Sequence, residues 1–538
     1  MENIYRSKVP PYTVPENLSL HQFLTQYNPD ICRHDDIILE DLALPLKRLT
    51  YGGLRTKSAI GAASLQQQFQ LQPGDTAIIY ATNSVDYSLF AHSIMWMGCV
   101  IAGVNIAWSG AELAHAIETV EPKVIACDAS LRHRVEEGLR SVTGLKHVPR
   151  ILILGEQPGN FPRSFIDEPP LGSIPLPPFD LSIDDSRKHA CLILFSSGTT
   201  GLPKAVLLSH FNIIAHLLSA RTSDARLNGS SSREVFFAPF AHMLGALGAI
   251  LVPPFVGSYV GVMKEFELQD YIKACAKSRA TILKAVPSVV VAFAQHPLAQ
   301  KLNLTSVNNI LSAGATLKPE VVAKLQNLLK GVSFVQGYGE IRVVDEDYND
   351  VEPGQAGEVL LRSPTVFMYV PNTSSVSHVS KVDCRGYKKN QKATQESFHQ
   401  GWLRTGDVLS IDDDGFLWFH ERRKELIKVK GHQVAPSELE GILGSHDLVI
   451  EAAVCGYFDA DRQTEWPIGY VVLAPSVPQT EYSKTLKAIH VWLDNQVASY
   501  KRLRGGLHYI DSVPKNPTGK LMRQNLPIKL AEKRKTKI

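Results

Sequence analysis

Short apolar runs alternate with amphipathic segments over much of the first 340 residues of the chain. Between Leu49 and Val206, period-2 and period-3.6 patterns predict strands at 76–80, 99–104 and 123–127 and helices at 87–97 and 111–120. The alternation returns later, with strand-like runs at 235–238, 281–286, 309–312 and 333–336. Strands that alternate with helices predict α/β architecture. Residues 163–186, rich in Pro, Ser and Asp, predict a long connector.

The pattern changes near Arg422-Arg423-Lys424, where we expect a domain boundary. Before it, Asp412–Phe419 predicts a turn that leads into a strand. After it, Ser437-Glu438-Leu439-Glu440 matches a Ser-x-x-Glu capping box and predicts the start of a helix. The chain is therefore expected to divide into a domain at 1–423 and a small domain at 424–538.

Residues 195–206, FSSGTTGLPKAV, combine hydroxyl groups, glycines and a lysine between two apolar runs. Glycines let backbone N–H groups turn toward an anion, and Lys204 adds a mobile positive charge. The spacing is not that of a P-loop, and Pro203 disfavours a following helix. We expect a strand, a phosphate-binding loop and a second strand. The alternative is a Ser/Gly/Thr surface loop of a hairpin.

Composition and charge argue against several classes of function and indicate a cellular compartment. The 538 residues are 44% hydrophobic and 20% charged, and the net charge of +3 argues against a nucleic-acid partner. Seven scattered cysteines without a CxxC pair fit a reducing compartment. The apolar run Gly245–Val256 is too short to span a bilayer. The final Thr-Lys-Ile is similar to a peroxisomal tripeptide, so we expect a cytoplasmic or peroxisomal location.

Three further motifs follow in order: QGYG at 336–339, GWLRTGD at 401–407 and PKNPTGKLMR at 514–523. With 195–206 and the segment RRKELIKVKGHQVAPSELE, they make the chain resemble the adenylate-forming superfamily of acyl-CoA synthetases, firefly luciferases and peptide-synthetase adenylation domains. The likeness is greatest to the 4-coumarate–CoA ligase-like branch and covers nearly the whole chain. It implies an α/β fold with a large N-terminal domain of two βα sub-domains plus a small barrel-like part, and a small mobile α+β C-terminal domain.

The resemblance also implies a two-step reaction with ATP, Mg²⁺ and CoA. A carboxylate attacks the α-phosphate of ATP, which gives an acyl-adenylate and pyrophosphate, and a thiol then displaces AMP. Because the first step brings anions together, the site must supply donors and cations.

Family motifs map individual residues onto this chemistry. Lys204 and the loop would hold the β- and γ-phosphates, and Lys520 would bridge the substrate carboxylate and the α-phosphate. The loop residues are Ser196, Ser197, Gly198, Thr199, Thr200 and Gly201. Asp407 would accept hydrogen bonds from the ribose hydroxyls and Arg422 would face the nucleotide. Gly314, Ala315 and Tyr338 would line the adenine and acyl pockets, with His242 at the mouth of the acyl pocket.

The resemblance assigns the remaining residues to domain rotation and to CoA. Lys424 matches the hinge, and Lys428, Gly431 and Gln433 would face the CoA channel after rotation. Each assignment has a structural alternative: a solvated lysine for Lys520, a turn residue for Asp407, a structural ring for His242, and an alternating solvent face for Lys428.

The chain departs from the family pattern at two places. Gly339 runs directly into Glu340-Ile341-Arg342, so the segment that carries a Thr to the α-phosphate and a Glu to Mg²⁺ is missing. Glu340 is a candidate replacement metal ligand, although it aligns better with a downstream strand. Residues 369–385 are a polar insertion that we expect to form a loop. An intron read as protein, together with a second splicing difference, would explain both departures.

The leading hypothesis is an ATP-dependent acid–thiol ligase that acts on an aryl or medium-chain carboxylic acid, with CoA as acceptor and no transmembrane segment. A carrier-protein thiol is an alternative acceptor. An amino-acid-activating domain would place an Asp near Glu267, which is an imperfect match. A luciferase-type oxygenase and a catalytically impaired, nucleotide-binding homologue are further alternatives, and the missing segment favours the last.

Overall fold

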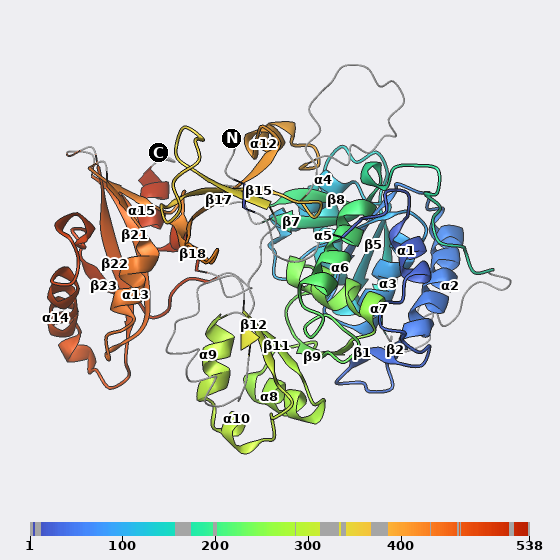
Figure 1. Ribbon diagram of the computed structural model, residues 1–538, viewed down its shortest axis with the longest axis horizontal. Coiled ribbons are helices and arrows are strands. Elements are labelled where there is room, and N and C mark those ends of the chain that lie inside the picture. The colour runs from blue at the N-terminus through green and yellow to red at the C-terminus, as the bar shows by residue number, and fades with distance from the viewer. Residues whose placement is uncertain are drawn as a thin grey trace. The chain divides into compact units, whose positions relative to one another are not determined.

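The computed structural model describes residues 4–5, 12–155, 174–196, 202–285, 287–312, 333–334, 340–366, 386–430, 432–459, 462, 464–515 and 521–535. The chain divides into two compact units. One comprises 7–337 and 363–401, and the other comprises 1–6, 338–362 and 402–538. The mixed α/β architecture of the first unit and the small C-terminal α+β part of the second confirm the predicted fold class (Figure 1).

A six-stranded sheet forms half of the first unit, in the order β6-β5-β3-β4-β7-β8. Its neighbours are parallel except β7 and β8. The strands are β3 (Thr76–Tyr80), β4 (Val100–Gly103), β5 (Val124–Asp128), β6 (Arg150–Leu154), β7 (Ala190–Ser196) and β8 (Lys204–Ser209). The strand expected at 76–80 is confirmed to the residue, because the buried run TAIIY packs on both faces of the sheet.

A seven-stranded sheet forms the other half, in the order β13-β12-β11-β9-β10-β1-β2. Its strands are β1 (Ile37–Asp41), β2 (Arg48–Thr50), β9 (Arg233–Phe236), β10 (Tyr259–Val262), β11 (Ile282–Ala285), β12 (Asn309–Ser312) and β13 (Ser333–Phe334). The strand expected at 235–238 instead ends at Phe236. The amide of Asn83 donates to the carbonyls of Phe237, at 3.3 Å, and Ala238, at 2.9 Å, which are therefore not available to continue the ladder.

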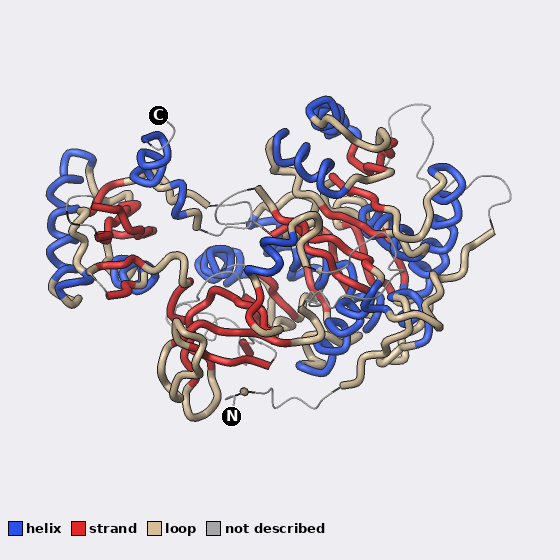
Figure 2. Tube along the Cα trace, turned by 90° about the horizontal axis from the view of Figure 1, so that it is seen from above, coloured by secondary structure: helices blue, strands red, loops and turns tan. Residues whose placement is uncertain are grey.

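Helices cover both sheets, as the alternation of strands and helices in Figure 2 shows. One apolar cluster contains residues of both sheets and of three helices between them, α2 (Tyr51–Phe69), α3 (Val85–Trp96) and α6 (His210–Ser223). The outer faces carry α4 (Gly110–Val120) and α5 (Arg132–Ser141) on one sheet and α8 (Leu268–Lys277) and α9 (Pro287–Gln295) on the other. Among the described residues, the other α-helices of this unit are α1 (Leu20–Gln26), α7 (Pro253–Val256), α10 (Pro297–Lys301) and α12 (Gln391–Glu396), Leu244–Leu251 form a π-helix, and β16 is Phe398–His399. No helix among the described residues is long and apolar enough to cross a membrane.

The second unit begins with an antiparallel sheet of β14 (Glu340–Val344), β15 (Gly357–Arg362), β17 (Trp402–Ile411) and β18 (Leu417–Arg422). It continues with the hairpin β19 (Ile427–Val429) and β20 (His432–Val434) and with a sheet of β21 (Val449–Asp459), β22 (Thr464–Leu473) and β23 (Leu507–Tyr509). Its helices are α13 (Pro436–Leu443), α14 (Tyr482–Asp494) and α15 (Pro527–Lys535).

The capping box expected at Ser437–Glu440 is wrong. Helix α13 begins one residue earlier, at Pro436, and no side chain caps it. Ser437 Oγ instead donates to the carbonyl of His420 at 2.9 Å, and the Glu440 carboxylate binds Arg523. Contacts with β18 and with the C-terminal segment therefore outcompete the local cap. The predicted division at 423/424 stays a prediction, and the insertion at 369–385 lies outside the described residues.

Candidate active site

The hairpin β7–β8 brings the two ends of the predicted phosphate loop together. Ser196 and Lys204 are backbone partners in the antiparallel ladder, and Ser196 Oγ donates to the carbonyl of Lys204 at 3.5 Å. The two strands predicted on either side of the loop are therefore confirmed. The loop residues Ser197, Gly198, Thr199, Thr200 and Gly201 lie outside the described part of the chain.

The base of the hairpin is fixed by contacts from distant segments. Lys204 Nζ lies 5.0 Å from the ring centroid of Tyr387, a cation–π geometry. The amide of Lys388 donates to the carbonyl of Ala205 at 2.8 Å, so residues 386–388 run beside β8. His115 Nε2 donates to the carbonyl of Pro203 at 3.1 Å. Sequence reasoning missed Tyr387, which gave no local signal because it lies more than 180 residues away along the chain.

His242 lies on the turn that follows β9. Its amide donates to the carbonyl of Pro239 at 3.0 Å, and its Nδ1 accepts from the amide of Leu244 at 3.3 Å. Buried Asn83 holds the same turn, because its Oδ1 accepts from the amide of Phe240 at 2.8 Å. Asn83 was also missed; a polar residue just after the apolar strand 76–80 is the signal that could have identified it.

Asp407 and Arg422, both predicted to contact the nucleotide, lie opposite each other on β17 and β18. Arg422 Nε is 3.2 Å from Asp407 Oδ1, and the Asp407 side chain is only 16% exposed. Thr405 Oγ1 accepts from the amide of Asp407 at 3.1 Å. The structure therefore brings together a carboxylate, which can accept ribose hydroxyls, and a guanidinium, which can face a phosphate.

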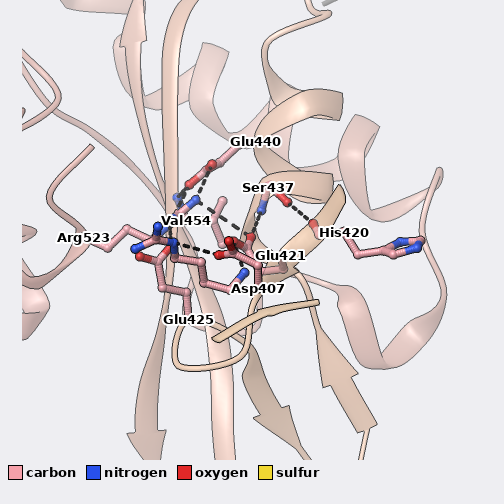
Figure 3. Close-up of polar contacts among 9 residues, drawn as sticks. Asp407, His420, Glu421, Glu425, Ser437, Glu440, Val454 and Arg523 are labelled. Atoms are coloured by element: carbon pink, nitrogen blue, oxygen red, sulfur yellow. Dashed lines mark hydrogen bonds and ion pairs between the residues drawn. The ribbon is translucent and has the colours of Figure 1, made fainter. Parts of the chain in front are cut away.

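The predicted hinge Lys424 lies in a turn between two sets of ion pairs. On one side, Arg423 donates to the buried Glu358 of β15 at 2.5 Å. On the other, Glu425 pairs with Arg523. Figure 3 shows the carboxylates of this region, including Glu421 and Glu440, gathered around Arg523.

The predicted CoA residues lie on the hairpin β19–β20. Lys428 and Gln433 are backbone partners, and the Lys428 side chain is exposed between buried Ile427 and Val429. This geometry fits both a CoA-facing lysine and an alternating solvent face. Gly431 and the side chain of Gln433 are not described, and neither are Gly314, Ala315, Tyr338 and Lys520.

The magnesium prediction has no support among the described residues. Glu340, the candidate ligand, begins β14, and its carboxylate accepts from Arg362 Nε at 3.2 Å. The guanidinium of Arg362 already lies next to this carboxylate, so Glu340 does not suit the role of a metal ligand. Within the described ranges, no cluster of three or more His, Cys, Asp or Glu side chains could hold a metal ion.

Comparison with known proteins supports the family suggested by the motifs. Residues 33–339 match the AMP-binding enzyme family, and residues 438–520 match the AMP-binding enzyme C-terminal domain. A probable 4-coumarate–CoA ligase 1 of Dictyostelium discoideum is 30% identical over 487 residues, which cover 85% of this chain and 86% of the relative.

Two further comparisons cover nearly the whole chain. The peroxisomal OPC-8:0-CoA ligase 1 of Arabidopsis thaliana is 28% identical over 574 residues and covers 98% of this chain and 96% of the relative. The crystal structure of ATP-bound MatB from Rhodopseudomonas palustris has a TM-score of 0.78 at 22% identity, covering 95% of this chain and 98% of that one. At that identity the structural match supports the fold alone.

Proposed function

The chain belongs to the AMP-binding enzyme family, as an enzyme of the 4-coumarate–CoA ligase-like type, and we propose that it converts an aryl or medium-chain carboxylic acid first to an acyl-adenylate and then to a CoA thioester. Adenylate-forming ligase activity follows from the family. The class of acid and the roles of individual residues are the proposal.

The observation that carries the proposal is the β7–β8 hairpin within the matched family region. The pairing of Ser196 with Lys204 holds the two ends of the hydroxyl- and glycine-rich segment next to each other. Such a loop can direct several N–H and O–H donors toward one anion, and Lys204 adds a positive charge. In the second unit, Asp407 and Arg422 would hold the ribose and a phosphate. Lys520 would then neutralise the charge that builds up on the α-phosphate as the carboxylate attacks.

A catalytically impaired homologue is the second candidate, and the junction at Gly339-Glu340 favours it. The family match ends at Gly339, and strand β14 begins at the next residue. The alignment with the Arabidopsis ligase runs over 574 residues, more than the 538 of this chain, so part of that relative has no counterpart here. The absent Thr and Glu would contact the transferring phosphate and Mg²⁺, and we expect their loss to weaken adenylation strongly.

One experiment distinguishes the two candidates. A panel of carboxylic acids is incubated with ATP, Mg²⁺ and CoA, and AMP release is measured for this chain and for a variant with the missing family segment restored after Gly339. An active ligase releases AMP with at least one acid in both forms. An impaired homologue binds nucleotide by calorimetry and releases AMP only in the restored form. Absence of AMP release in both folded forms would contradict the proposed activity. Sequencing the cDNA across both junctions tests the splicing hypothesis.

A further inference from the structure

Arg523 lies three residues after Lys520, in the last position of the motif PKNPTGKLMR, and it has no role in the assignments above. Its side chain is only 16% exposed. Three carboxylates surround it, and they come from three elements: Glu440 from α13, Glu421 from β18, and Glu425 from the turn after β18 (Figure 3).

The geometry of this cluster suits an arginine in particular. Nε donates to Glu440 Oε1 at 3.1 Å and Nη2 donates to Glu440 Oε2 at 2.8 Å, a bidentate pair. Nη1 donates to Glu425, and Nη2 lies 3.9 Å from Glu421 Oε2. A lysine ammonium has no planar fork and could not satisfy Glu440 and Glu425 at the same time. Burial raises the pKa of Glu440, so the nearby guanidinium is needed to hold this carboxylate charged.

The chain just before Arg523 is also fixed. Lys515 and Leu521 form an antiparallel bridge, and the amide of Met522 donates to the carbonyl of Pro514 at 2.8 Å. Lys515 Nζ is 2.5 Å from Glu451 Oε1 on β21. These contacts join the two sides of the segment that contains Lys520, and Arg523 anchors the C-terminal side to the rest of the unit.

The contacts of Arg523 continue through Glu421 to the proposed nucleotide-binding residues. Glu421 Oε2 accepts from the amide of Ser437 at 2.8 Å, and Glu421 Oε1 accepts from the amide of Arg422 at 2.9 Å. Arg422 in turn pairs with Asp407. The guanidinium of Arg523 is therefore linked through one carboxylate to the strand that presents the Asp407–Arg422 pair.

We propose that Arg523 is a positioning residue for adenylation, which fixes the chain immediately after Lys520 to α13 and to the turn at Glu421–Glu425. This inference rests on the proposed role of Lys520. A displacement of about 1 Å at a reacting group can cost about 100-fold in rate, so loss of the anchor should act on the step that uses Lys520. Because the proposed role of Lys520 is in the first step, thioester formation from a supplied acyl-adenylate should be affected much less.

The test compares the two half-reactions in full-length variants. Arg523→Ala should lower the rate of ATP–pyrophosphate exchange by about 10- to 100-fold. Its rate of CoA thioester formation from supplied acyl-adenylate should stay within about threefold of the wild-type rate. Arg523→Lys should behave like Arg523→Ala, and Glu440→Gln should fall between them and the wild type.

Lys501→Ala is the matched control. Lys501 pairs with Glu438 of α13, the helix that carries Glu440, at 2.7 Å, and among the described residues it does not contact 515 or 521–523, so both half-reactions should be unchanged. Lys520→Ala tests the proposed function itself. If Lys520→Ala keeps full exchange activity, the proposed function fails. If only Lys520→Ala loses exchange activity and Arg523→Ala keeps it, the role of Arg523 alone is refuted.

Limited trypsin cleavage after Lys520 gives a readout that does not need turnover. Cleavage at this bond should be several-fold faster in Arg523→Ala and Glu440→Gln than in the wild type or Lys501→Ala. A role in stability alone predicts instead that both half-reactions fall together with the melting temperature. That result, or unchanged cleavage in a chain too inactive for exchange measurements, would overturn the proposal.

Discussion

Acid should destabilise the first unit because three histidines are fully buried in its core. His21, His92 and His210 each have 0% exposure. Burial lowers the pKa of His92 to about 4 and of His210 to about 3, and it lowers the pKa of His21 well below the usual value. His92 Nε2 donates to the carbonyl of Ile250 at 3.1 Å, so its Nδ1 accepts from His21 Nε2 at 3.3 Å.

A second proton on these rings has no acceptor. His21 Nδ1 is buried without a hydrogen-bond partner among the described residues, and His210 Nδ1, which would take the second proton, already faces the amide N–H of Leu20. In the unfolded chain each histidine titrates near pH 6.5, so between about pH 4 and 6.5 the unfolded state binds more protons than the folded state. Stability is therefore fully present above this range and falls as the pH falls.

The expected loss of folding stability at pH 5 is large. At pH 5, each histidine that stays neutral in the folded state lowers the free energy of unfolding by about 2 kcal/mol. The reason is that pH 5 lies about 1.5 units below the unfolded pKa of about 6.5, and each unit corresponds to about 1.4 kcal/mol. His92 and His210 together cost about 4 kcal/mol, and His21 adds to this loss; the total stability of a typical domain is about 5–15 kcal/mol. Carboxylates titrate mostly below pH 5 and add little to the loss.

Thermal unfolding followed by near-UV circular dichroism at pH 7.5, 6 and 5 tests this reasoning. His210→Asn keeps an acceptor for the amide of Leu20, which His210 Nδ1 accepts at 3.0 Å, but removes the titrating ring. Its stability should change less steeply between pH 6 and 5 than that of the wild type. His133→Gln, at an exposed position on α5, should leave the slope unchanged. Equal melting temperatures at pH 7.5 and 5, or the same slope in His210→Asn, would show that the buried histidines do not cause the acid sensitivity.

Two further predictions concern charged pairs. Lys284 on β11 and Glu234 on β9, each 6% exposed, form an ion pair at 2.9 Å. Lys284→Met should lower the free energy of unfolding, measured by chemical denaturation, by about 3–5 kcal/mol because it leaves the buried carboxylate unpaired. The double variant with Glu234→Gln should recover most of that loss, and a double variant as unstable as Lys284→Met would contradict this. Asp407→Asn should raise the KM for ATP about tenfold by weakening one charge-assisted hydrogen bond and the pairing with Arg422. Asp413→Asn, exposed in the following turn, is the control, and equal KM values for the two variants would exclude the nucleotide contact.

Local pattern predicted much of the fold. Strand 76–80 and the strands around the phosphate loop, which are five to seven residues long, follow from the apolar runs within them. The ends of helices and strands were harder to predict where a side chain from a distant segment determines them. Strand β9 ends at Phe236 because Asn83, about 150 residues earlier, binds the next two carbonyls. Helix α13 begins at Pro436 because Ser437 binds β18.

The sequence predicted individual residues of the candidate site but not most of the contacts between them. Motifs identified Lys204, Asp407 and Arg422 separately, and the pairing of the last two follows from the register of β17 and β18. No motif indicated that Tyr387 packs on Lys204 or that Glu440 binds Arg523, which is 83 residues away. Such contacts depend on tertiary packing, and the period of a single segment carries no information about them.

In the proposed function, the positive charge of Lys520 allows a carboxylate and ATP, both anions, to react at phosphorus. ATP–pyrophosphate exchange with the best acid, in the variant with the restored segment, compared with and without Lys520→Ala, tests it most directly. We expect a folded Lys520→Ala variant to lose at least about 100-fold in exchange rate. An unchanged rate of acyl-adenylate formation would rule out the proposed role of Lys520.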